Sequence, residues 1–234
     1  MVQLSPDTYD HEWDWCSGYH YSDSSIMGFS HTHLSGTGIG DMLDVLVMPG
    51  TGAAKLEPGT RENPDAGYRS RFSHSDEKAT PGYYSVLLKD YGIKAELTAT
   101  ERTGLHRYTF PASDSSHFIV DLAHAYGGPE RVTSAELKVV GDSTITGGRR
   151  VNAWAKGRYI FFALKFSKPF ARFTVVSDGQ ELAGGAREAS GKSLKALVFY
   201  NTKAGEVVEV KVGLSAVSVE GALKNLETEQ PGWA

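Results

Sequence analysis

The chain has 234 residues, of which 40% are hydrophobic and 22% are charged, a composition ordinary for one large globular domain or two smaller ones. Its formal net charge of −4 argues against nucleic-acid binding, because a phosphate-binding surface has to be basic. No apolar run approaches the roughly 20 residues that a membrane-spanning helix needs. The single cysteine, Cys16, excludes an internal disulfide.

The sequence predicts strands along almost its whole length, because short alternating or apolar runs are separated by turn residues. In chain order, the predicted strands are residues 2–5, 41–48, 68–72, 83–89, 93–100, 104–110, 117–122, 133–140, 144–151, 158–166, 170–176, 194–200 and 206–215. Pro49 and Gly50 are expected to end the buried strand 41–48, and residues 51–65 and 177–193 are expected to be exposed loops. The last two strands are expected to form a hairpin.

Only residues 219–227 have the period of a helix, with Val219, Ala222, Leu223 and Leu226 on one face and Ser218 as the N-cap. A helix of about two turns is marginal alone, so we expect it to begin a longer helical segment. Strands do not alternate with helices, which disfavours a parallel sheet. The sequence therefore predicts an antiparallel sandwich or barrel with one terminal helix.

Residues 13–40, WDWCSGYHYSDSSIMGFSHTHLSGTGIG, combine aromatic residues, histidines, serines and glycines with little apolar periodicity. Such side chains are typical of functional loops held by a rigid scaffold. Trp13, Trp15, Tyr19 and Tyr21 alternate, so an extended backbone would place them along one side. Aromatic rings beside polar groups suit a sugar, but an aromatic satellite core explains the spacing equally well.

His31 and His33 would share one face of a strand, as a zinc pair requires, with His20 or Cys16 as a third ligand. No Cys-x-x-Cys or His-Glu-x-x-His spacing supports zinc, so hydrogen bonding to backbone or sugar hydroxyls is preferred. Cys16 could be a thiol nucleophile, but a lone cysteine beside Trp15 is more typical of packing.

Two further patterns in this region carry little chemistry. The glycines of residues 35–40 lack the Gly-Lys-Ser/Thr of a phosphate loop and indicate a loop with positive φ angles. Glycoside hydrolysis generally needs two carboxyl groups, and no pair stands out in the sequence. The candidates by position alone are Glu12, Asp14, Asp23, Asp41 and Asp44.

The segments WDWCSGYHYSD and GFSHTHLSGTGIGD resemble the N-terminal domain of glycoside hydrolase family 92 α-mannosidases, as do residues 81–111 and 211–229. The resemblance runs through essentially the whole chain. It implies an all-β antiparallel supersandwich of the galactose mutarotase type over residues 1–216. Residues 217–234 would then begin a helical linker to a missing (α/α)6 catalytic barrel.

The resemblance further implies a calcium-dependent, inverting exo-α-mannosidase that releases terminal, often α-1,2-linked, mannose from N-glycans or mannan. The catalytic Glu and Asp and most Ca²⁺ ligands would lie in the barrel, so this part of the enzyme would hold no metal and be inactive alone. Its partners would be mannose-containing glycans and its own barrel, and it would be periplasmic or secreted, with a signal peptide removed. The residues carried over as substrate-binding are Trp13, Trp15, Tyr19, His31, Thr32, His33, Ser35 and Gly36.

Two alternatives remain: a stand-alone carbohydrate-binding domain, and a mutarotase-like epimerase with a histidine and a carboxylate as acid and base. An epimerase needs a closed cleft on the concave sheet. A pocket-walling domain would present a shallow patch with residues 31–36 at its edge, apolar in places and prone to self-association. The terminal helix favours the pocket-walling domain.

Overall fold

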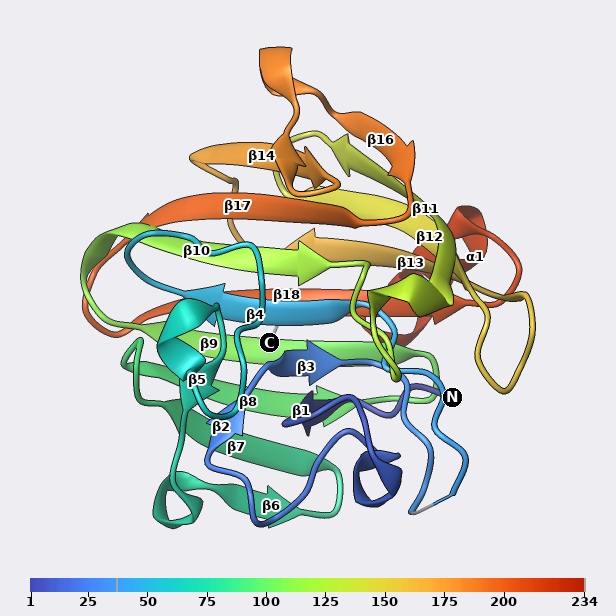
Figure 1. The fold of residues 1–234 in the computed structure, drawn as a ribbon. Coiled ribbons are helices and arrows are strands. Elements are labelled where there is room, and N and C mark those ends of the chain that lie inside the picture. Colours follow the sequence, from blue (N-terminus) through green and yellow to red (C-terminus); the bar gives the residue numbers. More distant parts are fainter. Residues whose placement is uncertain (37, 234) are drawn as a thin grey trace.

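The alternating strands pair with antiparallel neighbours and build two stacked sheets, as the computed structural model of residues 1–36 and 38–233 shows (Figure 1). One sheet has the order β1 (Ser5–Asp7), β3 (Gly28–Ser30), β4 (Leu46–Gly50), β10 (Ser113–Asp121), β17 (Leu194–Thr202), β14 (Arg172–Ser177) and β15 (Gln180–Glu181). The other has the order β16 (Glu188–Gly191), β11 (Val132–Val140), β12 (Thr144–Val151), β13 (Arg158–Phe166), β18 (Glu206–Ser215), β9 (Thr103–Phe110), β8 (Ile93–Ala99), β7 (Tyr83–Leu88) and β6 (Lys78–Thr80). The predicted antiparallel sandwich is confirmed.

Smaller elements lie between the sheet strands. They are the pair β2 (Ser25–Ile26) and β5 (Ser70–Arg71), and the single 3-10 turns η1 (Trp13–Trp15), η2 (Pro64–Ala66), η3 (His74–Asp76), η4 (Pro129–Arg131) and η5 (Ala183–Gly185). Within residues 1–36 and 38–233, no helix has the length and apolarity to cross a bilayer.

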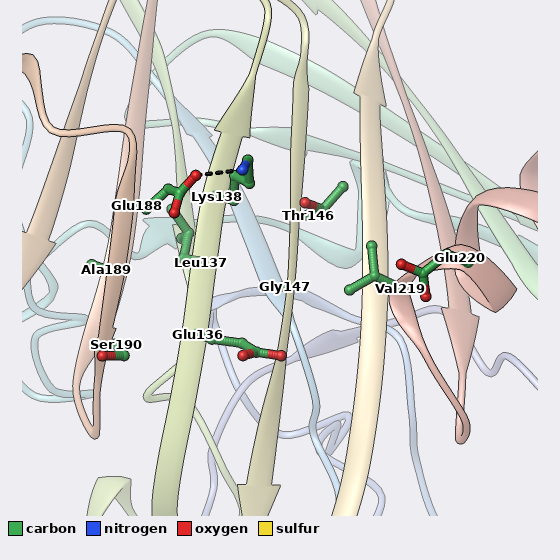
Figure 2. A pocket seen from close by; sticks show the side chains of 10 residues that line it. All are labelled: Glu136, Leu137, Lys138, Thr146, Gly147, Glu188, Ala189, Ser190, Val219 and Glu220. Carbon is green, nitrogen blue, oxygen red and sulfur yellow. Dashed lines mark ion pairs between the residues drawn. The ribbon is translucent and has the colours of Figure 1, made fainter.

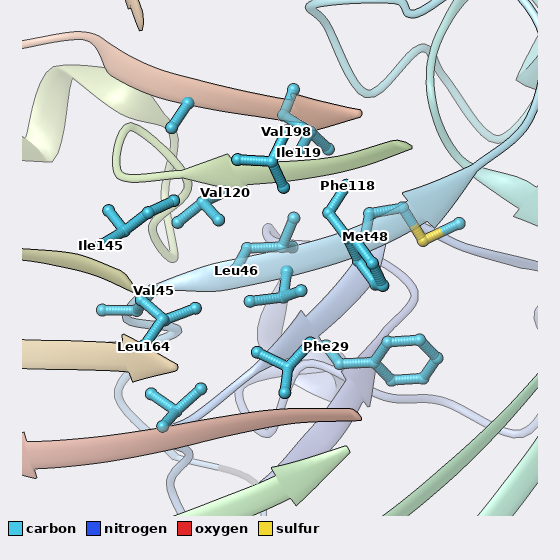
Figure 3. Close-up of a cluster of buried hydrophobic side chains, with 14 of the residues drawn as sticks. Phe29, Val45, Leu46, Met48, Phe118, Ile119, Val120, Ile145, Leu164 and Val198 are labelled. Atoms are coloured by element: carbon cyan, nitrogen blue, oxygen red, sulfur yellow. The ribbon is translucent and has the colours of Figure 1, made fainter. Parts of the chain in front are cut away.

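The core fills the space between the two sheets, where both contribute apolar side chains (Figure 3). Phe118 of β10 is fully buried, and its ring meets those of Tyr108 at 5.1 Å and of Phe110 and Phe166 at 5.5 Å on the opposite sheet. Edge-to-face pairs of this kind add roughly 0.5–1.5 kcal/mol each beyond burial. Phe118 therefore packs the two sheets against each other at the centre of the sandwich.

The single helix, α1 (Val219–Glu229), lies where the helical period predicted it, and Ser218 caps it by accepting a hydrogen bond from the Gly221 amide at 3.1 Å. Ala222 and Leu226 are buried against Ala163 of β13. Gly213 of β18 allows this close approach, since a Cβ there would lie 2.3 Å from the Ala222 carbonyl oxygen. Packing on the sheet thus stabilises a helix that would be marginal alone.

The predicted hairpin of residues 194–200 and 206–215 is wrong. β17 pairs with β10 and β14, whereas β18 pairs with β13 and β9, so the connection crosses from one sheet to the other. The first seven residues of β17 are all buried. A strand buried on both faces belongs in the middle of a covered sheet, and its burial outweighs the short turn that follows.

The boundaries of the strand predicted for residues 41–48 are also wrong. The strand runs from Leu46 to Gly50 and so includes the two residues expected to end it. Residues before it take left-handed φ angles of 75° at Met42, 61° at Leu43 and 59° at Val45. Non-glycine residues adopt this region only when the surroundings impose it. Residues 177–193, expected to be a loop, contribute β15, η5 and β16.

Candidate functional site

The loops rich in aromatic and polar side chains gather at one end of the sandwich, where residues 8–16 and the loop following β3 lie near the N-terminus (Figure 1). Trp13 and Trp15 lie in the 3-10 turn η1 rather than on an extended segment. The predicted alignment of four alternating rings along one side is therefore wrong. Trp13 is 62% exposed, while the indole of Trp15 donates to Asp23 at 2.6 Å.

His31 is fully buried in a chain of hydrogen bonds between the sheets. Its Nδ1 contacts the Val45 carbonyl at 2.7 Å, and its Nε2 contacts Nε2 of His106 at 2.8 Å. Nδ1 of His106 in turn contacts the Tyr108 hydroxyl at 2.8 Å. Because a carbonyl can only accept, His31 carries its proton on Nδ1, His106 donates from Nε2, and Tyr108 donates to His106. Burial lowers the pKa of His31 to about 4 and that of His106 well below its usual value.

His33 faces a different set of partners. Its Nδ1 contacts the Gln3 carbonyl at 2.6 Å, and its Nε2 contacts Asp7 at 2.6 Å. The second oxygen of Asp7 contacts Nε2 of His124 at 2.8 Å. Burial alone would raise the pKa of Asp7, but the charge of His33 and the hydrogen bond from His124 lower it well below its usual range. His31 and His33 follow β3 and do not face a common point.

No group of three or more histidine, cysteine or carboxylate side chains in residues 1–36 and 38–233 is arranged to hold a metal ion. The zinc alternative therefore finds no ligand set in this part of the chain. Cys16 is fully buried, and its Sγ contacts the Trp13 carbonyl at 2.9 Å and the Gly38 carbonyl at 2.7 Å. These contacts describe a packed thiol that joins two loops.

Asp44 is the centre of a buried ionic cluster. It accepts from Arg149 Nε at 2.8 Å, from Arg158 Nη1 at 2.5 Å and from the Thr32 hydroxyl at 2.6 Å. Arg158 also contacts Asp41 at 3.1 Å. Burial raises the pKa of Asp44, but the charges of Arg149 and Arg158 outweigh it and lower the pKa to about 2. The cluster joins the segment before β4, where the backbone takes left-handed φ angles, to Arg149 of β12 and Arg158 of β13.

Three large apolar side chains on the loops near this layer are exposed, and we call them the end patch: Trp13, Ile39 and Trp154, with exposed fractions of 62%, 55% and 69%. Its loops are tied together: the Tyr126 hydroxyl donates to the Glu12 carbonyl at 2.6 Å. The amide after Trp154, that of Ala155, donates to Asp41 at 2.9 Å. Three large apolar side chains on rigid loops are typical of a surface that another body covers.

The other residues that the family resemblance predicts to bind substrate are spread over several loops. Ser35 and Gly36 are exposed on the loop after His33, and Ser35 accepts from the Gln3 side chain at 3.2 Å. Tyr19 points away from the patch, with its hydroxyl 3.0 Å from Glu77. Contact of the eight predicted residues with substrate stays a prediction. His31 and His33 have no ring nitrogen free for a sugar, and they support the loops from beneath.

Two cavities flank this end. One of about 490 Å³ is bounded by Thr32, Arg158 and Tyr159 and by Asn225 of α1. The other, of about 570 Å³, lies over the nine-stranded sheet and contains Glu136, Glu188 and the Lys138–Glu188 ion pair (Figure 2). Of the eight residues predicted to bind substrate, only Thr32 lines one of these two cavities. Neither cavity is lined by a histidine, which an epimerase of the kind considered above would use.

Four residues that complete the buried polar layer were not predicted to be part of the site: Arg149, Arg158, His106 and His124. Arg149 lies 105 residues from Asp44, and His106 lies 75 residues from His31. No motif spacing links residues so far apart. The one available signal was the arginine in the strand 144–151, a charge at a position that strand alternation places among buried neighbours.

Comparison with known proteins places the sandwich among the N-terminal domains of glycosidases. The glycosyl hydrolase family 92 N-terminal domain matches residues 1–215, and the chain belongs to this family.

Solved structures agree with this assignment. The chain is similar to the family GH92 alpha-mannosidase of Bacteroides thetaiotaomicron, with 44% identity and a TM-score of 0.94, over 100% of this chain and 32% of that one. The same kind of enzyme in complex with mannoimidazole matches with 44% identity and a TM-score of 0.92, over 98% and 31% of the two chains.

A curated relative, an uncharacterized secreted glycosidase of Arthroderma benhamiae, is 27% identical over 92% of this chain and 30% of its own. The chain thus spans about a third of the length of the relatives that it matches.

Proposed function

We propose that this chain is the pocket-walling N-terminal domain of a calcium-dependent, inverting exo-α-mannosidase that releases terminal, often α-1,2-linked, mannose from N-glycans or mannan. The end patch carries the proposal. Trp13, Ile39 and Trp154 are exposed on loops that hydrogen bonds connect: Cys16 contacts the carbonyls of Trp13 and Gly38, and the Ala155 amide donates to Asp41. A second domain that covers part of this patch would leave the remaining aromatic and hydroxyl groups as one wall of a sugar pocket.

In this proposal the catalytic Glu and Asp belong to a second, (α/α)6 domain, and residues 217–234 lead towards it through α1. The similarity to alpha-mannosidases roughly three times longer supports this arrangement. The name of the Arthroderma benhamiae relative supports a periplasmic or secreted location. Calcium would be bound in the second domain. Among residues 1–36 and 38–233, no group of three or more histidine, cysteine or carboxylate side chains is arranged to hold a metal ion.

The test is mannose release from an α-1,2-linked mannobioside with calcium, by the 234 residues alone and by the same chain extended with the sequence encoded downstream. We expect activity only in the extended protein. Activity in the 234 residues alone would mean that a carboxylate pair acts within this domain. No activity in either would favour a stand-alone carbohydrate-binding domain.

Variants of the extended protein test the end patch itself. Trp13→Ala and Trp154→Ala should each lower kcat/KM at least tenfold, because each ring either contacts the sugar or seats the second domain. Val140→Ala is the matched control, since Val140 is an exposed apolar residue on the distant strand β11. An equal effect of the control would contradict a role confined to the end patch.

A further inference from the structure

A cavity of about 430 Å³ lies at the open edge of the sandwich, away from the end patch. Ser5 and Pro6 of β1 and Ala79 of β6 form part of its wall. β1 and β6 are the outermost strands of the two different sheets, and both lie in the lower part of Figure 1. The volume is within the range of roughly 300–1,000 Å³ that small-molecule sites occupy.

The polar centre of this cavity is Glu77, whose carboxylate is only 10% exposed. Tyr84 donates to its Oε1 at 2.6 Å, and Tyr19 donates to its Oε2 at 3.0 Å. His74 Nδ1 contacts the same Oε2 at 2.8 Å. Burial, and then the charge of Glu77, raises the pKa of Tyr19 well above its usual range, so the phenol stays a donor. A carboxylate has about four acceptor positions, so one remains for a ligand.

An aromatic platform lies beside this carboxylate. The ring of Tyr21 stacks on His74 with centroids 4.0 Å apart and an interplanar angle of 14°, and Tyr21 is 69% exposed. Phe72 supports His74 edge-on at 5.1 Å. A stacked pair backed by a buried ring presents a flat apolar surface of fixed orientation. Both Tyr21 and His74 line the cavity that contains Glu77.

We propose that this cavity binds a neutral saccharide, with the C–H face of a pyranose ring against Tyr21 and a ring hydroxyl donating to Glu77. A flat apolar surface next to a fixed acceptor matches the two chemical features of a sugar ring. No lysine or arginine lines the cavity, so an anionic ligand lacks a counter-charge. The site is distinct from the end patch and goes beyond the proposed function.

Two other ligand chemistries fit less well. A quaternary ammonium ion needs several ring faces around it, whereas Tyr19 and Tyr84 direct their hydroxyl groups at Glu77. An epimerase needs its acid and base on either side of the substrate, whereas His74 and Glu77 are bonded directly to each other. The geometry therefore points to binding without chemistry.

The test is calorimetric titration of the 234-residue chain with methyl α-mannoside and with methyl α-glucoside, together with gel retardation by yeast mannan. We expect at least one of these saccharides to bind. Tyr21→Ala should weaken that binding about tenfold, because the flat ring face against the sugar is lost. Glu77→Gln should weaken it by a similar factor. Because Tyr21 is largely exposed, its variant should keep the wild-type melting temperature.

Val140→Ala is the control, and it should leave this binding unchanged because Val140 is exposed and does not line the cavity. Absence of saccharide binding would overturn the inference, as would binding that Tyr21→Ala leaves intact. If tetramethylammonium binds and the saccharides do not, with the same dependence on Tyr21 and Glu77, the ligand of this cavity is a cation and the saccharide proposal is wrong. Mannose release by the extended protein plays no part in this experiment, so the proposed function and this inference fail independently.

Discussion

Lowering the pH from 6 to 5 should destabilise the chain by more than about 1 kcal/mol through the buried pair His31 and His106. In the unfolded chain each imidazole has a pKa of about 6.5. Burial lowers the folded-state pKa to about 4 for His31 and well below the usual value for His106. The unfolded state therefore binds protons that the folded state excludes, and stability is lost as the pH falls from about 6.5 towards 4. His31 contributes about 1.2 kcal/mol between pH 6 and 5, and His106 adds to the loss in the same direction.

Among the other groups with shifted pKa values, His124, Asp7 and Asp44 change this slope little, whereas His117 adds to it. The hydrogen bond and charge of Asp7 outweigh burial and raise the pKa of His124, so that ring is largely protonated in both states below pH 6. Asp7 and Asp44 have lowered pKa values, so their contribution is lost only at more acidic pH. Burial also lowers the pKa of His117, which adds to the loss in the same direction.

The assay is urea unfolding followed by tryptophan fluorescence at pH 6.0, 5.5 and 5.0, with the slope of unfolding free energy against pH as the readout. His31→Gln should reduce the slope by about 1.2 kcal/mol per pH unit, whatever its effect on stability at pH 7. His11→Gln is the matched control, because the His11 side chain is 48% exposed. An unchanged slope in His31→Gln would refute the assignment of the pH dependence to this buried pair.

Three further substitutions test the packing. Gly213→Val should detach α1, because a Cβ at Gly213 would lie 2.3 Å from the Ala222 carbonyl oxygen. Circular dichroism should show the loss of the helix. An intact helical signal would contradict this packing. Ser218→Ala should lower the free energy of unfolding by about 1 kcal/mol, measured by urea denaturation, because the cap is lost. Arg149→Met should cost about 3–5 kcal/mol by the same measurement, because Asp44 is left with one buried charge partner fewer. A cost below about 1 kcal/mol would show that Arg158 alone compensates Asp44.

Much of the fold could be predicted from local sequence, because strand alternation and turn residues act over a few positions. The meander of β7, β8 and β9 and the capped helix α1 are examples, and both lie close to their predicted ranges. The connection between β17 and β18 could not be predicted, because its turn length fits a hairpin as well as a crossing. What decides the pairing is the burial of β17 on both faces, which depends on strands distant in sequence.

The candidate site was predictable in location but not in geometry. Aromatic and polar residues in one unpatterned stretch indicated functional loops, and Trp13 does lie on the exposed end of the sandwich. The spacing of His31 and His33 says nothing of their partners, because those partners come from other strands. Tyr19 was grouped with Trp13 by proximity in sequence, yet its hydroxyl points to Glu77 at the open edge.

The crossing from β17 to β18 also sets the order in which this chain can fold. β17 lies between β10 and β14, and β18 lies between β13 and β9, so the last two strands are interior members of both sheets. The seven-stranded sheet is not continuous until β17, which ends at Thr202, is available, and the nine-stranded sheet is not continuous until β18, which ends at Ser215, is available. We expect folding to require almost the complete domain, because its strand pairs join residues that are far apart in the sequence. We therefore expect a chain that ends before β18 to leave the nine-stranded sheet divided and to expose apolar surface during synthesis.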